Sequence, residues 1–258
     1  MKIAVLIKPT PDTADLPALR ADDVARGHIQ AELVINPWDE YAVEEALLLD
    51  ERFSADLVAF SVAAADNTQA LRHAVALGIG SGKLIDRDSL AGGDLWDIAA
   101  ALAAAVRAEG DVDLVLTGKQ SVDENSGVVH VGVARKLGWP LLSNVGKIMD
   151  ITGRRITVER LVDGVQETVS APLPAVVSVG KEINEPRYPG LMGQRRAAKA
   201  TFDHLTADAL GVAVAGRTRW DNLRKPDSRA PQVRMMEGAT PAEQAAALVD
   251  ALLADKVL

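Results

Sequence analysis

The segment "DLVLTGKQSVDENSGVVHVGVARKLG" (residues 113–138) places an apolar run, a polar loop and a helical pattern in direct succession. The run "DLVLT" has the length and composition of a buried β-strand. The stretch from Gly127 ends at Gly138, and glycine commonly terminates helices. Open parallel sheets bind their ligands beyond the carboxyl ends of their strands. The segment therefore predicts a strand, a ligand loop and a helix, which together form one unit of a parallel sheet.

The same alternation of strand and helix runs through the first 180 residues. Further apolar runs of strand length lie at 2–8, 56–62, 82–86 and 175–179. Helical patterns between them lie at 36–51, 66–78 and 94–108. The first of these helices has Asn36 as its expected N-cap and Pro37 at its first position. Strands that alternate with helices form a parallel sheet covered on both faces, so we expect an α/β fold with an open, doubly wound parallel sheet.

An antiparallel excursion interrupts this alternation after residue 146. The segment "GKIMDITGRRITVERLVDGVQETVSAP" alternates with a period of two residues around Thr152-Gly153 and Asp163-Gly164. Both dipeptides are typical of tight hairpin turns. We therefore expect antiparallel hairpins here, before the last buried strand.

The last part of the chain differs in pattern from the rest. Residues 181–239 show little periodicity, and a helix is indicated only where Thr240 and Glu243 have the spacing of a capping box. A stretch of this length without pattern is unusual inside a compact domain. We expect an α/β domain over residues 1–200 and an extended C-terminal arm over residues 201–258, whose terminal helix packs on a partner.

Composition excludes several classes of function. The 258 residues carry a formal net charge of −8 and no cysteine. The negative charge argues against nucleic-acid binding, because phosphate backbones require a basic surface. The lack of cysteine excludes thiolate metal sites and cysteine nucleophiles. No apolar run reaches the roughly 20 residues of a membrane span, and the first strand begins at Lys2, so a cytoplasmic protein without membrane insertion is expected.

Motifs for catalysis are missing. "TGKQS" lacks the first glycine and the Lys-Ser or Lys-Thr pair of a phosphate-binding Walker loop. No glycine fingerprint follows the first strand, and no G-x-S-x-G nucleophile motif is present. We therefore predict no catalytic residue.

We expect the isolated titratable side chains to have structural roles and not catalytic ones. Asp123 and Glu124 are expected to cap the helix that begins near Ser126. The acidic residues of the first helix are expected to form a solvated face; these are Glu44, Glu45, Asp50 and Glu51. The histidines have no partner at metal-ligand spacing, so surface or packing roles and no metal site are expected; these are His28, His73, His130 and His204.

The loop after "DLVLT" nevertheless has the features of a binding site. Gly118 permits close approach of a backbone, and Gln120 and Ser121 offer hydrogen bonds to a base or ribose. The expected helix N-terminus at residues 126–128 offers free amides to a phosphate. The pattern predicts a nucleotide that is bound and not chemically transformed.

Four motifs give the chain a family resemblance. "INPWDEYAVEEALLL" (35–49), "DLVLTGKQSVDENSG" (113–127), "LPAVVSV" (173–179) and "INEPRYPGLM" (183–192) resemble successive signatures of the beta subunit of electron transfer flavoproteins. They stand in the same order and at matching spacing over nearly the first 200 residues. The chain is thus identified as similar to that family.

The resemblance implies a fold, cofactors and partners. The sheet would be of the adenine-nucleotide-binding type, and the chain would pair with an alpha subunit that carries FAD. The beta subunit would bury AMP, help to enclose the FAD, and dock flavin dehydrogenases on the way to a quinone oxidoreductase. It would act as an electron carrier subunit, with positioning of the flavin as its task and no side-chain catalysis.

The resemblance also implies which residues take part. Leu191 occupies the position of a leucine that anchors dehydrogenase partners. The expected nucleotide contacts come from the first strand, the first helix, the second strand and the loop; they are Leu6, Asn36, Pro37, Trp38, Asp39, Ser61, Val62, Gly118, Lys119, Gln120, Ser121, Val122, Asp123, Glu124, Asn125, Ser126, Gly127, Val128 and Val129.

Two alternatives stay open. "KPTPDT" (8–13) and "AGGD" (91–94) are closer to electron-bifurcating and Fix-type relatives, which hold a second FAD in place of AMP. The segment after Leu191 lacks the lysine run of common members, so the dehydrogenases it serves are not indicated. A stand-alone ATP-binding module of the stress type has a similar architecture, although it would leave the arm without a role.

Overall fold

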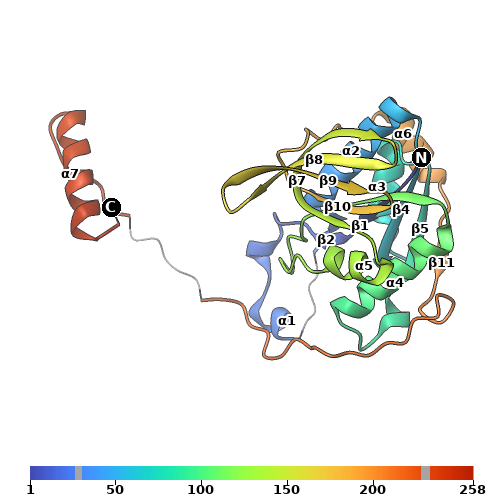
Figure 1. The fold of residues 1–258 in the computed structure, drawn as a ribbon. Helices are drawn as coiled ribbons and strands as arrows, with labels where there is room; N and C mark the ends of the chain where they lie inside the picture. Colours follow the sequence, from blue (N-terminus) through green and yellow to red (C-terminus); the bar gives the residue numbers. More distant parts are fainter. Residues whose placement is uncertain (27–30, 228–232, 258) are drawn as a thin grey trace. The chain divides into compact units, whose positions relative to one another are not determined.

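The structure, a computed structural model, describes residues 1–26, 31–227 and 233–257 (Figure 1). The chain divides into two compact units, Met1–Leu223 and Arg224–Leu258. The first unit contains the sheet and the candidate site. Helices in the described ranges are all too short or too polar to cross a membrane.

Within the described residues, nine strands form one sheet in the order β11-β5-β4-β1-β6-β10-β7-β8-β9 (Figure 1). The strands from β11 to β7 are parallel, and β8 and β9 add an antiparallel extension. Their bounds are β1 (Lys2–Ile7), β4 (Asp56–Ala63), β5 (Ser81–Asp86), β6 (Val112–Gly118), β7 (Leu141–Thr152), β8 (Arg155–Val162), β9 (Val165–Pro172), β10 (Ala175–Val179) and β11 (Asp203–Leu205). A small antiparallel pair consists of β2 (Pro9–Pro11) and β3 (Leu33–Ile35).

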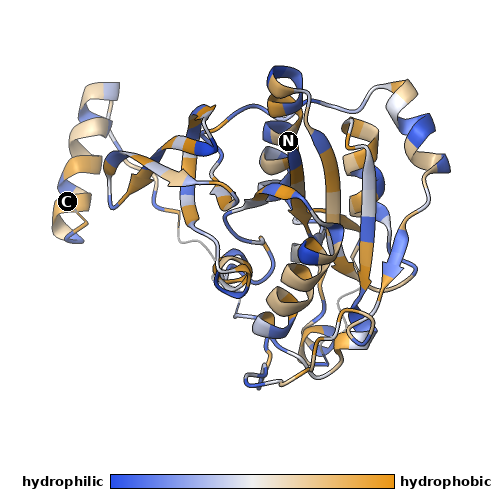
Figure 2. Ribbon diagram, turned by 45° about the vertical axis from the view of Figure 1, so that its right-hand side comes forward, coloured by the Kyte–Doolittle hydropathy of each residue, from blue (hydrophilic) through white to orange (hydrophobic). Residues whose placement is uncertain are grey.

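Helices α2 and α3 cover one face of the sheet, and α4 and α5 cover the other. The helices in the described residues are α1 (Ala21–Ala25), α2 (Pro37–Phe53), α3 (Gln69–Leu77), α4 (Leu95–Glu109), α5 (Val129–Leu137), α6 (Leu191–Lys199) and, in the second unit, α7 (Pro241–Ala254), with short 3-10 helices η1 (Leu16–Ala18) and η2 (Arg87–Leu90). Alternate residues of β1 point to opposite faces. Ile3 and Val5 pack against α2 and α3, whereas Ala4 packs against α4 and α5. Figure 2 shows the resulting apolar central strands. The α/β fold with a doubly wound, mostly parallel sheet is confirmed.

The hairpin excursion is also present, with one shift. The second turn lies at Asp163-Gly164, where both residues have positive φ (50° and 79°). The first turn lies at Gly153-Arg154 (φ 57° and 60°), one residue later than the expected turn at Thr152-Gly153. Positive φ at both central positions is the geometry that suits the twist of hairpin strands.

The segment after residue 181 is more regular than its sequence indicates. It contains α6 and β11, and β11 pairs in parallel with β5. Helix α6 buries only Ala197, so it has no apolar stripe from which periodicity could reveal it. It is attached to α3 through backbone carbonyls: Arg196 Nη2 donates to the carbonyl of Val75 over 2.9 Å, and Arg72 Nη1 donates to that of Ala197 over 2.5 Å.

The close approach of α6 to α3 depends on Gly193. A Cβ atom at this position would overlap the backbone carbonyl oxygen of Ala76, which cannot move freely. We expect Gly193→Ala to lower the free energy of unfolding by about 1–3 kcal/mol and to increase hydrogen exchange in α6. Gly190→Ala is the matched control, because a Cβ there meets no atom within 4 Å and is expected to be neutral. Equal exchange in the two variants would contradict this packing.

The second unit consists mainly of α7. Thr240 Oγ1 accepts a hydrogen bond from the Glu243 amide over 3.3 Å, as expected from the capping pattern. None of the helix is buried, and its exposed apolar side chains include Leu248, Val249 and Leu253. The helix therefore has an apolar surface that its own unit does not cover.

Candidate functional site

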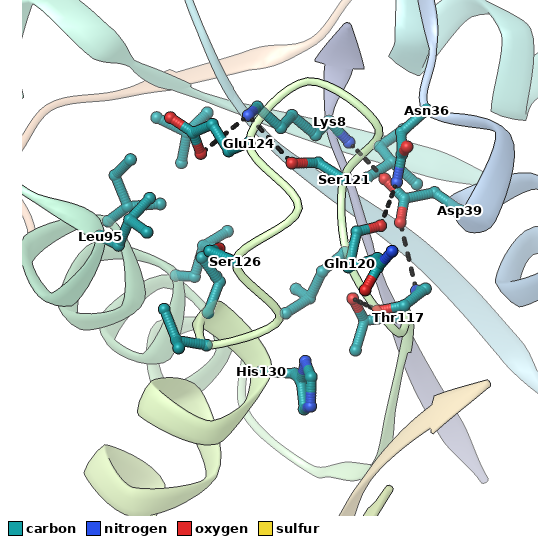
Figure 3. Close-up of a pocket in the computed structure, with 18 of the residues that line it drawn as sticks. Lys8, Asn36, Asp39, Leu95, Thr117, Gln120, Ser121, Glu124, Ser126 and His130 are labelled. Carbon is teal, nitrogen blue, oxygen red and sulfur yellow. Dashed lines mark hydrogen bonds and ion pairs between the residues drawn. The ribbon is translucent and has the colours of Figure 1, made fainter. Parts of the chain in front are cut away.

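A cleft opens at the carboxyl ends of β1, β4 and β6, next to the N-terminus of α5 (Figure 3). It holds about 770 Å³ of empty space, counting the part open to solvent. Because β1 lies between β4 and β6, the cleft stands where the strand order reverses direction. Its walls are formed by Leu6, Ile7, Lys8, Asn36, Asp39, Val62, Arg87, Leu95, Ile98, Leu102, Thr117, Gly118, Gln120, Ser121, Glu124, Ser126, Gly127, Val128, Val129 and His130.

Asp39 joins the ends of the two central strands. Its Oδ2 accepts a hydrogen bond from the Lys8 amide over 2.8 Å, and its Oδ1 accepts one from the Gly118 amide over 3.2 Å. The side chain is only 4% exposed. Burial raises the pKa of Asp39 to about 7, although the two amide hydrogen bonds act in the opposite direction. This carboxyl group thus fixes the shape of the cleft floor.

Asn36 anchors the loop instead of capping its own helix. Its side chain caps no backbone amide in the first turn of α2. Its Nδ2 donates to the carbonyl of Gln120 over 2.9 Å, and its Oδ1 accepts from the amide of Val122 over 3.1 Å. A residue that resembles a local cap is therefore a long-range clamp on the loop.

This clamp gives a testable expectation. Asn36→Ala is expected to lower the free energy of unfolding by about 1–3 kcal/mol, because two partly buried backbone groups of the loop lose their partner. Hydrogen exchange of residues 119–125 should rise in the variant. Asn67→Ala, which removes a half-buried side chain bonded to the amide of Gln69, is the control. An unchanged exchange pattern in the loop would show that other contacts hold it.

Gly118 is required because the start of α2 packs directly against it, not because a ligand does. A Cβ atom at this position would lie 2.6 Å from the carbonyl carbon of Trp38 and 2.6 Å from Oδ1 of Asp39. The close approach that the sequence suggested is thus made by the start of α2. Lys119 extends over the Trp38 ring at 4.2 Å, which adds a cation–π contact to the same junction.

Lys8 pairs with the two acidic residues of the loop. Its Nζ lies 2.9 Å from Asp123, 3.1 Å from Glu124 and 3.4 Å from Ser121 Oγ (Figure 3). Burial raises the pKa of Asp123, but hydrogen bonds from Ser121 and Lys8 outweigh it, so the pKa lies below its ordinary value. Both carboxylates are therefore committed to an ion pair that ties the loop to the end of β1.

The N-terminus of α5 faces the cleft without a cap. The helix begins at Val129, three residues later than the expected start near Ser126, so the expectation that Asp123 and Glu124 cap it is wrong. The N-cap residue Val128 offers no side-chain acceptor, and the first turn carries no acidic residue. The amides of this turn and the positive end of the helix dipole are thus available to an anion.

Comparisons with known proteins agree with this architecture. The electron transfer flavoprotein domain matches residues 28–210. Electron transfer flavoprotein subunit beta of Mycobacterium tuberculosis is 34% identical over 268 residues, which cover 99% of each chain. The Bacillus subtilis protein of the same name is 33% identical over 260 residues, or 98% of this chain and 97% of its own length. The probable counterpart in Schizosaccharomyces pombe is 31% identical, with 88% and 89% covered.

The chain belongs to the electron transfer flavoprotein beta-subunit family. The resemblance carried by the four motifs is confirmed. These relatives are named as electron transfer flavoprotein subunits, which fits a carrier role.

In this family member the cleft gathers most of the residues that the sequence indicated. Those in its wall are Leu6, Asn36, Asp39, Val62, Gly118, Gln120, Ser121, Glu124, Ser126, Gly127, Val128 and Val129. Those outside the wall are Pro37, Trp38, Ser61, Lys119, Val122, Asp123 and Asn125. Ser61 stands between Phe60 and Val62, which pack on the α4 side, so its side chain points to the opposite face. Its buried hydroxyl has no partner among the described residues.

Sequence reasoning missed eight residues of the wall. They are Ile7, Lys8, Arg87, Leu95, Ile98, Leu102, Thr117 and His130. The apolar members of α4 look like ordinary core residues, and nothing local distinguishes the turn of α4 that reaches the cleft. Lys8 could have been predicted from the sequence, because a lysine that directly follows a buried strand lies at the ligand edge of the sheet.

The expectation of a solvated acidic face on α2 is wrong for Glu44 and Glu45, which are buried. Arg187 donates two guanidinium bonds and its backbone amide to Glu44, over 2.8–3.1 Å, and a further bond to Glu51. Asn184 Nδ2 donates to Glu45 and to the carbonyl of Tyr41. These contacts hold residues 184–187 on α2, immediately before Leu191, whose side chain is 64% exposed.

Across residues 1–26, 31–227 and 233–257, no group of three or more acidic or histidine side chains is arranged to hold an ion.

Proposed function

We propose that the chain is the beta subunit of a heterodimeric electron transfer flavoprotein and binds an adenine nucleotide in this cleft. It helps to enclose the FAD of an alpha subunit and docks flavin dehydrogenases, from which electrons pass on to a quinone oxidoreductase. The location proposed for this complex is the cytoplasm. The observation that carries the proposal is the uncapped N-terminus of α5 at the topological switch point of a family-typical sheet.

The residues present fit an adenine nucleotide. Apolar side chains of β1, β4 and α4 offer a surface for the base; these are Leu6, Val62, Leu95, Ile98 and Leu102. Gln120, Ser121 and Ser126 offer hydrogen bonds to the base and ribose. The α5 amides suit a phosphate. Lys8 pairs with both loop carboxylates, so it offsets one of their two negative charges near that phosphate.

The protein's task in this proposal is positional. Bound flavin supplies the redox chemistry. The chain's own residues shape the nucleotide cleft, exclude water from it and present the docking surface. A nucleotide that binds only the folded chain also stabilises it by mass action. No side chain takes a catalytic role.

AMP is the proposed ligand, and a second FAD is the alternative. One observation favours the alternative: Arg87 and Leu95, on either side of "AGGD", both lie in the cleft wall. That segment resembles bifurcating relatives, and its two flanks, though not residues 91–94 themselves, border the cleft.

Docking to dehydrogenases is proposed for the start of α6. Leu191, Met192 and Tyr188 expose large apolar or aromatic surfaces on a segment held firmly to α2. Such side chains serve as hot spots in transient interfaces. The second unit, with its uncovered α7, is proposed to pack on the alpha subunit.

Co-purification tests the proposal against its main rival. The chain is expressed together with an electron transfer flavoprotein alpha subunit from the same organism, and the pair is analysed by gel filtration with absorbance at flavin wavelengths. A single flavin-bearing complex is expected. An isolated chain that remains a stand-alone dimer and turns over ATP in the presence of magnesium would overturn it in favour of an ATP-binding module.

A further inference from the structure

His130 is a buried titratable group for which the fold provides no partner. It lies in the first turn of α5 and is 7% exposed. No hydrogen bond reaches its ring nitrogens from any residue that the structure describes. By contrast, His73 lies 3.3 Å from Glu40, and His204 is exposed. Buried polar side chains normally have hydrogen-bond partners, so the imidazole is suited to a group that arrives from outside the chain.

The imidazole belongs to the cleft wall. Figure 3 shows it between α5 and the end of β6. It lines the same cleft as Ser126, Gln120 and Thr117. Its position in the first helical turn places it beside the free amides that attract an anion. Two independent features of one wall, the uncapped helix end and an unpartnered imidazole, thus suit the same negatively charged group.

Most of the other charged groups around the cleft already have partners within the protein. They come from β1, α2, η2 and the loop, and they are Lys8, Asp39, Arg87 and Glu124. Lys8 is shared between Glu124 and Asp123 of the loop, and Asp39 is occupied by two backbone amides. Burial lowers the pKa of His130, so the ring is neutral at pH 7 and offers one N–H donor and one acceptor.

We propose that His130 is a phosphate-contacting residue of the nucleotide site and donates a hydrogen bond to the phosphate group held at the N-terminus of α5. This assignment rests on the proposed nucleotide function. The negative charge of the phosphate stabilises the protonated imidazole, so binding takes up a proton from solvent onto the ring. Nucleotide affinity therefore increases as the pH falls below neutrality, for as long as the phosphate remains ionised, down to about pH 6.

Calorimetry on the complete heterodimer tests the assignment. The complex is freed of nucleotide by dialysis and titrated at pH 7.0 with AMP, adenosine and FAD. Two buffers of different ionisation enthalpy measure the protons taken up. Three variants are compared with the wild type: His130→Gln, His130→Asn in case the first fails to fold, and the exposed control His204→Gln. Urea unfolding verifies that each is folded.

The expected result has three parts. The His130 variants bind AMP about tenfold more weakly, the loss expected for one charge-assisted hydrogen bond. They bind adenosine as tightly as the wild type does. They also lose the proton uptake that the wild type and His204→Gln show with AMP.

Other outcomes distinguish a failure of the His130 assignment from a failure of the proposed nucleotide function. Equal AMP affinity and equal proton uptake in the wild type and the His130 variants would overturn the assignment of His130 and leave the nucleotide site intact. An equal loss for AMP and adenosine would also overturn it, because His130 would then contact the sugar or merely pack the wall. A wild type that binds neither AMP nor FAD would refute the proposed function itself.

Discussion

Asp39→Ala is expected to empty the cleft and to lower the free energy of unfolding by about 2–4 kcal/mol. The side chain accepts hydrogen bonds from two buried amides, those of Lys8 and Gly118. Each orphaned amide costs about 1–3 kcal/mol, and relief of the buried carboxyl group offsets part of that loss. Because these amides end β1 and β6, their displacement also distorts the floor of the nucleotide site. Urea unfolding and the nucleotide content of the purified heterodimer measure the two effects.

Two further variants sharpen this prediction. Asp39→Asn keeps one acceptor and should lose about half as much stability. Glu40→Ala alters the neighbouring acid, which pairs with His73 outside the cleft, and should change the stability by about 0.5 kcal/mol or less. A nucleotide content and stability of Asp39→Ala equal to those of Glu40→Ala would show that Asp39 does not hold the strand ends.

The pKa of Asp39 adds a pH signature to the same experiment. It is about 7 in the folded chain against an ordinary 3.8, so between these values the folded state keeps a proton that the unfolded state has lost. The contribution of Asp39 therefore makes the wild type less stable as the pH rises from about 4 to 7. Asp39→Asn lacks this slope, so its stability deficit should be larger at pH 5 than at pH 8. Parallel stability curves would contradict the raised pKa.

Arg187→Gln is expected to lower the free energy of unfolding by about 3 kcal/mol and to release the docking segment from α2. Glu44 is only 5% exposed, and Arg187 is the cation that binds it. The hydrogen bond with Glu44 is the main reason that the pKa of Arg187 is raised. Loss of the guanidinium leaves a buried carboxylate unpaired, which is the costly way to break an ion pair. Hydrogen exchange over residues 184–199 should increase accordingly.

The double variant Glu44→Gln/Arg187→Gln distinguishes the cost of leaving Glu44 as an unpaired charge from the cost of losing the packing of the Arg187 side chain. It removes the unpaired charge, so it should be more stable than Arg187→Gln alone. Lys2→Gln is the control, since Lys2 is also bound by two carboxylates, Glu109 and Asp56, at a site remote in sequence from the docking segment. If Lys2→Gln raised exchange over residues 184–199 as much as Arg187→Gln, the proposed clamp would lose its support.

Much of the fold was predictable because its determinants are local. Buried parallel strands such as β1 and β6 are continuous apolar runs, and the helices between them have their own end signals, such as Pro37 in α2 and Gly138 after α5. The ligand edge followed from chain direction alone, since the loop after β6 must lie at the carboxyl ends of the strands. Six residues of the cleft wall could thus be named from the loop itself, and the family resemblance supplied the other six; the six from the loop are Gly118, Gln120, Ser121, Ser126, Gly127 and Val128.

What could not be predicted depends on partners that are distant in sequence. Glu44 is buried only because Arg187, 143 residues away, neutralises it. Asn36 has the sequence context of an N-cap, yet its partners are 84 and 86 residues away, in the loop. Helix α6 has a polar, Arg-rich sequence, and only the absence of a side chain at Gly193 lets it approach α3. In each case tertiary contacts override the local signal.

The central claim is that this cleft holds an adenine nucleotide, and a count of released nucleotides tests it most directly. The heterodimer is denatured with acid, and the supernatant is quantified by chromatography for both the wild type and Asp39→Ala. We expect one FAD and one AMP per wild-type complex, with AMP lost from the variant. Two FAD and no AMP would assign a second flavin to the cleft. Nucleotide confined to the alpha subunit, with none lost in Asp39→Ala, would contradict the claim.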